Sequence, residues 1–117
     1  MRTGRFYGHM NVYHTRHWEQ KRAYILRRDK YQCQLSARYG KARQADTVHH
    51  IFPVRDFPEY AFESWNLISL SKEMHNKLHD RETDELTDEG IRLLERTALK
   101  YGVTIPPGYI KNRRTKG

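Results

Sequence analysis

The chain has 117 residues and a mass of 14.1 kDa, a length that suits one domain with short ends and leaves no room for two cores. No run approaches ~18 consecutive apolar residues and the first residues lack an apolar stretch, so we expect a soluble intracellular protein with no membrane span. With a single cysteine, Cys33, an internal disulfide is excluded, and so is a metal site made only of thiolates.

The net charge of +8 is unevenly distributed. Residues 1–30 carry eight basic and two acidic side chains, and residues 105–117 carry four basic and no acidic ones. The segment 51–104 between them has 7 basic and 11 acidic side chains. Because Lys and Arg contacts with phosphate supply most sequence-independent affinity for nucleic acids, nucleic acid is the first partner to consider. A solvated basic surface on a small protein explains the charge equally well.

The predicted first helix covers residues 16–28. Thr15 can cap its N-terminus, and large apolar side chains recur on one face at helical spacing: Trp18, Ile25 and Leu26. Residues 1–14 in front of it are interpreted as a basic N-terminal arm. The segment 31–35 behind it alternates only weakly between polar and apolar residues, so it is assigned no regular element.

Two short strands are predicted in the middle of the chain. The β-branched residues of 46–51 favour the first strand, and 66–70 has the composition of the second. Pro53 and Pro58 argue against regular structure in the loop between them. The aromatic side chains of this loop can stack on bases, but we expect them to pack into the core: Phe52, Phe57, Tyr60, Phe62 and Trp65.

Two helices are predicted after the strands. Ser71 can cap a helix over about residues 72–81, and a last helix starts at Thr87 or Asp88 and ends near Gly102. Consecutive prolines at 106 and 107 then stop regular structure, which leaves 105–117 as a basic C-terminal tail. The predicted order is helix, strand, strand, helix, helix.

Four of the seven histidines fall in two pairs. His75 and His79 lie four residues apart, and on a helix such residues share a face, so both imidazoles can reach one ion. His49 and His50 are neighbours on a predicted strand and point to opposite faces. One of them can complete a three-histidine site that leaves metal positions open, while the other is free to act as a base. A nearby amide such as that of Asn66 can hold the ring of that base in the right tautomer.

The order and spacing of these residues resemble the HNH, or ββα-metal, endonuclease family. His50, Asn66 and His75 match the three letters of its name and are separated by 16 and 9 positions. The resemblance runs from about Trp18 to His79. Over this segment the chain is most similar to the small HNH proteins of bacteriophages and prophages, which also tend to open with a Trp-bearing helix. It implies an α+β fold in which a ββα-metal core over about 45–82 contains a two-stranded antiparallel hairpin, flanked by an N-terminal and a C-terminal helix.

The resemblance also implies roles for the site residues within a domain of residues 15–104. The general base falls on His50, and Asn66 falls on the residue that fixes the loop and the base. The metal ligands fall on His49, His75 and His79. The implied reaction is metal-dependent hydrolysis of DNA phosphodiester bonds, by nicking or double-strand cleavage, in phage genome processing or packaging. One divalent ion per chain is expected, with zinc, nickel, manganese and magnesium as candidates.

The expected partner is DNA, with a phage terminase as a candidate second partner and no membrane. Either a monomer or a homodimer fits. We expect the protein in the cytoplasm, which is the host-cell cytoplasm if a phage encodes the chain. His14 and His17 are interpreted as non-ligands. The candidate side chains for nucleic-acid contact are arginines: Arg2, Arg5, Arg27, Arg28, Arg113 and Arg114.

One feature departs from the pattern of this family. Many members carry two C-x-x-C pairs that hold a structural zinc, and the matching positions here are Cys33, Ser36, Ser71 and Met74. Three of the four thiols are missing, so no second, structural zinc is expected. We expect Leu35 and Met74 to fill the space with apolar contacts instead.

Two alternatives remain open for the function. One is a non-catalytic DNA-binding module stabilised by a metal ion, in which four protein ligands close the coordination sphere. The other is a toxin-like nuclease that needs an inhibitor partner.

Overall fold

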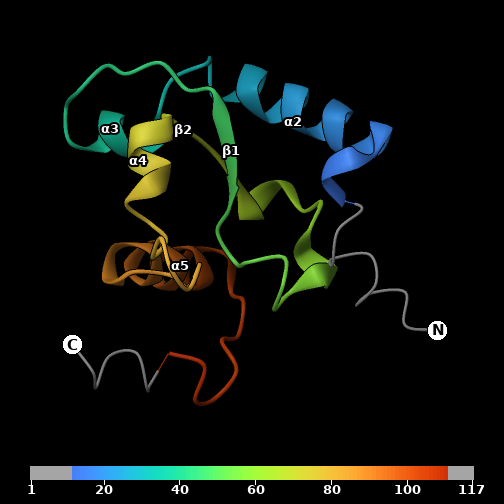
Figure 1. The fold of residues 1–117 in the computed structure, drawn as a ribbon, viewed down its shortest axis with the longest axis vertical. Coiled ribbons are helices and arrows are strands. Elements are labelled where there is room, and N and C mark those ends of the chain that lie inside the picture. The colour runs from blue at the N-terminus through green and yellow to red at the C-terminus, as the bar shows by residue number, and fades with distance from the viewer. Residues whose placement is uncertain (1–11, 111–117) are drawn as a thin grey trace.

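The structure is a computed structural model that describes residues 12–110. Two strands lie in the middle, with helix α2 to one side and helices α3, α4 and α5 to the other (Figure 1). The elements in chain order are η2 (Val12–His14), α2 (Arg16–Arg28), α3 (Gln34–Arg38), β1 (Thr47–His50), η3 (Pro58–Tyr60), η4 (Ser64–Asn66), β2 (Leu67–Leu70), α4 (Lys72–Asn76) and α5 (Asp88–Tyr101). The expected small α+β fold is confirmed. Within residues 12–110, no helix is long and apolar enough to cross a membrane.

Strands β1 and β2 form the expected antiparallel hairpin, in which Thr47 faces Leu70 and His50 faces Leu67. The loop that joins them, residues 51–66, contains the two 3-10 turns η3 and η4. Its aromatic side chains are buried or packed against buried residues, as expected: Phe52, Phe57, Tyr60, Phe62 and Trp65. The loop is therefore held by the core, which makes it a rigid support for the strand beside it.

Helix α2 begins where the sequence predicts. The Thr15 hydroxyl accepts a hydrogen bond from the Trp18 amide at 3.0 Å, which caps the N-terminus. Trp18, Ile25 and Leu26 are buried and pack with Val48 and Leu67 of the strands. Burial of such side chains stabilises the fold by roughly 1.5–3 kcal/mol each.

The C-terminal end of α2 is tied to β2 through Arg28 and Asp29. The Arg28 guanidinium binds the Asp29 carboxylate at 2.8 Å and donates to the carbonyl oxygens of Ser64 and Leu67 at 2.9 and 2.7 Å. The same carboxylate accepts from the Ser69 amide at 3.0 Å. The guanidinium of Arg28, a candidate nucleic-acid contact, thus donates to the protein itself in three directions.

Helix α3 was not predicted. The sequence indicated no regular element for residues 31–35, whereas the structure has a helix over Gln34–Arg38. Cys33 is fully buried at its N-cap, and the Ser36 hydroxyl donates to the Cys33 sulfur at 3.2 Å. Leu35 belongs to the main core cluster and Met74 packs against it, as expected for residues that fill the space of the missing thiols. A helix of five residues is too short to show a hydrophobic period, which explains why the sequence did not reveal it.

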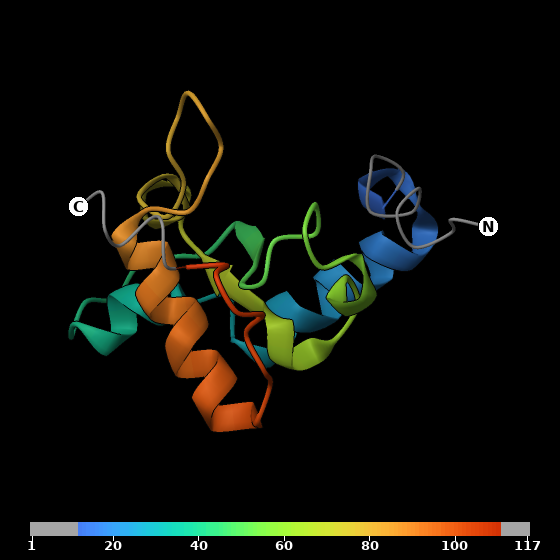
Figure 2. The same cartoon turned by 90° about the horizontal axis from the view of Figure 1, so that it is seen from below.

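Helix α4 is shorter than the predicted 72–81. The Ser71 hydroxyl caps it by accepting from the Met74 amide at 3.1 Å, but the helix ends at Asn76. Thr87 binds the carbonyl oxygens that follow, since its hydroxyl donates to Lys77 at 2.7 Å and its amide to Leu78 at 2.9 Å. These bonds replace the next helical turn. The chain beyond α4 forms a loop that projects from the body of the molecule (Figure 2).

Helix α5 packs along the core beside this loop. The Thr87 hydroxyl caps its N-terminus by accepting from the Gly90 amide at 3.3 Å, and Gly102, with a left-handed φ of 67°, ends it as predicted. A Cβ at Gly90 would lie 2.6 Å from the Leu78 carbonyl oxygen, so this close approach of helix and loop requires glycine. The main core cluster includes α5 residues Ile91, Leu93, Leu94 and Ala98.

Residues 105–110, assigned to the tail by the sequence, lie against the core. Ile105, Tyr109 and Ile110 pack on the main cluster, and the Tyr109 hydroxyl donates to the Asp56 carboxylate at 2.7 Å. The remainder of the predicted tail and most of the predicted arm lie outside the described residues.

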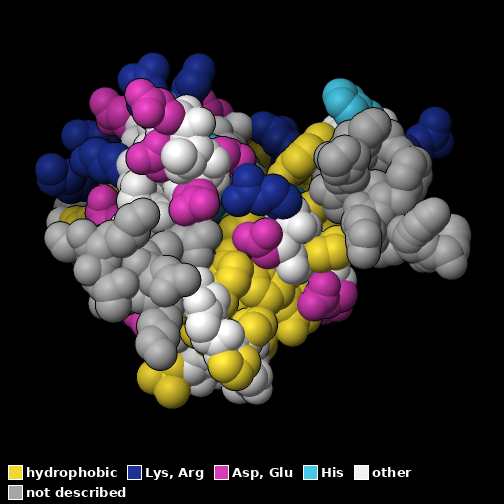
Figure 3. Space-filling view, turned by 60° about the horizontal axis from the view of Figure 1, so that its bottom comes forward, with side chains coloured by type: hydrophobic (Ala, Val, Ile, Leu, Met, Phe, Trp, Pro, Cys, Tyr) yellow, Lys and Arg dark blue, Asp and Glu magenta, His cyan; other side chains and the backbone are white. Residues whose placement is uncertain are grey.

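Charged side chains of both signs lie on the face of the molecule drawn in Figure 3. On the face drawn in Figure 3, acidic and basic side chains are interleaved around an exposed apolar area. Arg27 is exposed in the last turn of α2. Four other candidate nucleic-acid contacts lie outside residues 12–110: Arg2, Arg5, Arg113 and Arg114.

Candidate metal centre and the adjoining histidine

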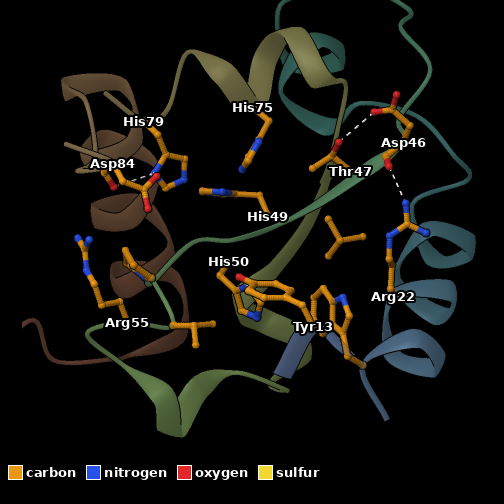
Figure 4. Close-up of a pocket in the computed structure, with 14 residues that line it drawn as sticks. Tyr13, Arg22, Asp46, Thr47, His49, His50, Arg55, His75, His79 and Asp84 are labelled. Atoms are coloured by element: carbon orange, nitrogen blue, oxygen red, sulfur yellow. Dashed lines mark hydrogen bonds and ion pairs between the residues drawn. The ribbon is translucent and has the colours of Figure 1, made fainter. Parts of the chain in front are cut away.

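The three predicted ligands, His49, His75 and His79, come together in space. One ring nitrogen from each lies within 4.8 Å of the others, and the ring centroids are 5.1 to 5.2 Å apart. Figure 4 shows His49 pointing from β1 toward His75 on α4 and toward His79. Three imidazole nitrogens at this spacing can bind one ion.

His79 reaches the cluster although it is not on a helix. Its backbone pairs with Leu86 in an isolated antiparallel bridge beyond the end of α4. Its Nδ1 lies 3.4 Å from the Asp84 carbonyl oxygen and 3.7 Å from the Asp84 carboxylate, and both interactions turn the ring toward the cluster. The spacing of four residues correctly predicted that His75 and His79 meet, but the reason it gave, a shared helix face, was wrong.

His49 supplies the observation that tests whether a metal fits. Its side chain is 1% exposed, and its Nε2 is the one buried side-chain nitrogen or oxygen without a hydrogen-bond partner among the described residues. A buried polar atom without a partner costs roughly 1–3 kcal/mol. A cation shared with His75 and His79 would satisfy that atom, so the residues present fit a bound metal ion.

The electrostatics keep two of these imidazoles, those of His49 and His75, in the form that binds metal. Burial lowers the pKa of His49 well below its usual range, and the neighbouring histidines lower it further. Burial likewise lowers the pKa of His75, with a further contribution from His79. Neutral imidazoles offer a lone pair to a cation, so no proton has to be removed first from His49 or His75 near neutral pH.

The side chain of His50 points away from the cluster into a different environment. Its ring stacks on Trp18 with a centroid distance of 4.9 Å and an interplanar angle of 23°. Its Nε2 lies 2.9 Å from the carbonyl oxygen of Ala61, which can only accept a hydrogen bond. Nε2 therefore carries the ring proton, and the lone pair of the neutral ring is on Nδ1. Burial lowers the pKa of His50 to about 4, so the ring is neutral at pH 7.

Asn66 is fully buried and fixes the loop that carries Ala61. Its Oδ1 accepts from the Phe52 amide at 2.7 Å, and its Nδ2 donates to the carbonyl oxygens of Phe52 and Tyr60 at 3.1 and 3.2 Å. The sequence suggested that this amide holds the base directly. In the structure the backbone of Ala61 orients His50, and Asn66 acts on it through the loop.

Both histidine environments open onto one pocket of about 750 Å³. Besides the four histidines, its lining includes Tyr13, Arg22, Arg55 and Asp84, none of which the sequence had singled out. The Tyr13 hydroxyl lies 3.3 Å from His50 Nδ1. Arg22 donates to the Asp46 carbonyl oxygen at 2.6 Å, and Arg55 lies 3.7 Å from Asp56 and is about half exposed. The pocket thus combines three candidate imidazole ligands, a neutral histidine with its lone pair on Nδ1, and two cations.

His17 lies outside the metal cluster, with its ring stacked on Phe62 at a centroid distance of 3.9 Å. The pocket residues that the sequence missed had little signal. Ala61 acts through a backbone carbonyl, which every residue type has, and Tyr13 is separated from His50 by 37 positions.

Comparisons with known proteins found one informative relative. No family model matches the chain, and no curated protein matches it. Among solved structures, the chain is similar to the crystal structure of the HNH endonuclease of the deep-sea thermophilic bacteriophage GVE2 with manganese ion. The two are 36% identical, with a TM-score of 0.54, over 55% of this chain and 70% of the phage protein. At that identity and coverage, and with a buried three-histidine cluster beside His50 and Asn66, the chain belongs to the HNH endonuclease family.

Proposed function

We propose that the chain is a metal-dependent endonuclease that hydrolyses phosphodiester bonds in DNA, with His50 as the general base. The observation that carries the proposal is the pairing of two features in one pocket. One is the unpartnered Nε2 of buried His49 beside His75 and His79. The other is the lone pair on His50 Nδ1, which follows from the contact of Nε2 with Ala61.

His50 Nδ1 takes a proton from water in this mechanism. The water oxygen forms a bond to phosphorus, and the bond between phosphorus and the 3′ oxygen breaks with its electron pair on that oxygen. The family resemblance then implies a product with a 5′ phosphate. The Ala61 carbonyl stabilises the imidazolium that forms, because it accepts a hydrogen bond from Nε2–H throughout. His50 returns to its neutral form by losing the proton to solvent.

The ion would be held by His49, His75 and His79. When bound, it would neutralise negative charge on the phosphate and on the leaving oxygen. Three imidazoles suit a first-row transition ion such as manganese, zinc or nickel better than magnesium, which prefers oxygen ligands. The similar phage endonuclease was crystallised with manganese, which makes manganese the first ion to test. We propose one divalent ion per chain.

Cations of the chain would hold the DNA backbone around this pocket. Arg22 and Arg55 line the pocket itself, and Arg27 is exposed on α2. The arginines of the two ends extend this set in the proposal: Arg2, Arg5, Arg113 and Arg114. Such contacts are sequence-independent, so we propose low sequence specificity or guidance by a partner such as a phage terminase during packaging. In this scheme residues 15–104 are the main part of the catalytic domain, and η2 and residues 105–110 pack against it.

The direct test is the conversion of supercoiled plasmid to nicked and linear forms. Metal-stripped protein is given manganese, zinc, nickel or magnesium singly, and His79→Ala is run beside the parent chain. We expect cleavage only with added metal, together with weaker metal binding by the variant in titration calorimetry. His14→Ala, a change of an exposed histidine, is the matched control. If the chain binds metal and shifts DNA on a gel but does not cleave the plasmid with any of the ions, it is the non-catalytic module instead.

A further inference from the structure

The hydroxyl of Tyr13 contacts the one atom of His50 that can accept a proton. Tyr13 lies in the turn η2, just before helix α2, and its oxygen is 3.3 Å from Nδ1. Since Nε2–H is already donated to the Ala61 carbonyl, Nδ1 can only accept, and the phenol must be the donor in this contact. Water that gives its proton to His50 must therefore either pass it through Tyr13 or displace it.

Aromatic packing holds Tyr13 in this position. Its ring meets Trp18 edge-on at a centroid distance of 5.5 Å and His50 edge-on at 5.7 Å, while His50 stacks on Trp18. Edge-on and stacked pairs of this kind contribute about 0.5–1.5 kcal/mol each. The three rings thus form one cluster, and displacement of Tyr13 would break two of its contacts.

The other side of Tyr13 is open to the pocket. The side chain lines the pocket and is 52% exposed, and Figure 4 shows it beside His50 where the pocket meets α2. A phenol oxygen that donates one hydrogen bond still has lone pairs that accept another. Water in the pocket can therefore donate to Tyr13 Oη while the Tyr13 proton points at His50.

We propose that Tyr13 is a catalytic residue that passes a proton from the attacking water to His50. As the water O–H bond breaks, its proton moves to Tyr13 Oη and the Tyr13 proton moves to His50 Nδ1. The water oxygen attacks phosphorus, and the bond to the 3′ oxygen breaks with its electron pair on that oxygen. Tyr13 ends the step neutral and His50 ends it protonated. This inference rests on the proposed function, because it needs His50 to be the base.

The neutral state of the phenol supports this role. Desolvation around the hydroxyl raises the pKa of Tyr13 although the residue as a whole is half exposed, with a smaller contribution from the negative charge of Asp84. The hydroxyl therefore keeps its proton at neutral pH and is available as a donor. A relay needs this, since each transfer onto the oxygen is matched by a transfer away from it.

Single-turnover plasmid nicking by Tyr13→Phe tests the proposal, at saturating manganese and with Tyr39→Phe, a change of an exposed tyrosine, as control. We expect a rate at least about 10²-fold lower for Tyr13→Phe, the lower end of the range for positioned proton transfer, with metal and DNA affinity unchanged. Rates in mixtures of light and heavy water should also curve for the parent chain, as two protons in flight require. That second measurement needs no variant and does not depend on how Tyr13→Phe folds.

Two outcomes overturn the relay, and neither is confused with failure of the nuclease proposal. A Tyr13→Phe rate equal to or above that of the parent shows that Tyr13 only covers the base and is displaced by water. A linear dependence on heavy water shows that one proton moves. His50→Ala in the same assay separates the two proposals. If His50→Ala loses activity while Tyr13→Phe nicks at the rate of the parent chain, only the relay is rejected.

Discussion

Asn66 and Phe52 exchange two hydrogen bonds across the loop that joins the strands, one of 2.7 Å from the Phe52 amide and one of 3.1 Å to its carbonyl. The side-chain nitrogen of Asn66, Nδ2, also donates to the carbonyl oxygen of Tyr60. Tyr60 is followed by Ala61, whose carbonyl oxygen accepts a hydrogen bond from His50. The chain of contacts runs from Asn66 to the loop and from the loop to the base. Orientation of the base is therefore a property of the folded loop.

Asn66→Ala should lower both stability and activity. It leaves buried backbone groups of Phe52 without partners, which costs about 2–4 kcal/mol of unfolding free energy. The nicking rate at low temperature should fall because Ala61 loses its position, while metal affinity stays close to that of the parent. Urea unfolding measures the stability, plasmid nicking measures the rate, and titration calorimetry measures the metal affinity. Asn76→Ala, a change of an exposed residue on α4, is the control. If Asn66→Ala lost metal affinity by the same factor as it lost nicking rate, this division of roles would be contradicted.

Metal should stabilise the chain through the three-histidine cluster. An ion that binds the folded chain alone adds about 2.7 kcal/mol of unfolding free energy at 100 times its Kd, and it satisfies the buried Nε2 of His49. Thermal unfolding with and without manganese measures the increase in Tm. The increase should vanish in His79→Ala and persist in His14→Ala. The same increase in both variants would place the ion elsewhere.

The metal-free chain should lose stability as the pH falls from 7 to 5. The folded state holds the pKa of His50 at about 4, below the 6.5 of the unfolded chain, so the unfolded chain binds more protons in this window. Stability is therefore complete above pH 6.5 and falls toward pH 4, with about 2 kcal/mol lost by pH 5 from His50 alone. Burial acts in the same direction on His49 and His75.

Urea unfolding of the metal-free chain at pH 7, 6 and 5 measures this loss. His50→Gln removes one of the titrating groups, so its unfolding free energy should change less over the same interval. Unfolding free energies that stay level or rise toward pH 5 would show that these histidines are not held neutral by burial.

Arg27 and Arg28 are neighbours with different expected effects. Arg28 ties α2 to β2 through Asp29 and two carbonyl oxygens, so Arg28→Ala should destabilise the fold by about 2–3 kcal/mol. Arg27 is exposed, and Arg27→Ala should leave stability unchanged and reduce the salt slope of DNA binding by about 1. Unfolding curves and binding titrations at several salt concentrations compare the pair. The reverse assignment of effects would refute the contact proposed for Arg27.

The sequence predicted the parts of the fold that side-chain patterns encode. The caps Thr15, Ser71 and Thr87 are where the residue types favour them, and the antiparallel hairpin lies where β-branched residues and its bounding turns indicate. The end of α4 was wrong because Thr87, distant in sequence, binds the carbonyls that the next helical turn would use. Such tertiary competition has no local signal.

The site follows the same division. The histidine spacing predicted that one of the two strand histidines joins His75 and His79, and the family resemblance assigned that place to His49, as the structure has it. It could not identify Ala61, because that residue acts through a carbonyl that any residue supplies, or Tyr13, which reaches His50 only through the packing of η2 against α2. Asp84 could not be identified either, because only the fold of its loop distinguishes it from the neighbouring acidic residues by placing it beside His79.

The most direct test of the central claim is the single-turnover nicking rate of His50→Ala at saturating manganese, measured beside its affinities for metal and DNA. Loss of a positioned base should lower the rate by about 10²–10⁴-fold. Metal affinity should remain, because His50 points away from the cluster, and DNA affinity should change little. A rate equal to that of the parent chain would show that another group takes the proton and that His50 is not the base.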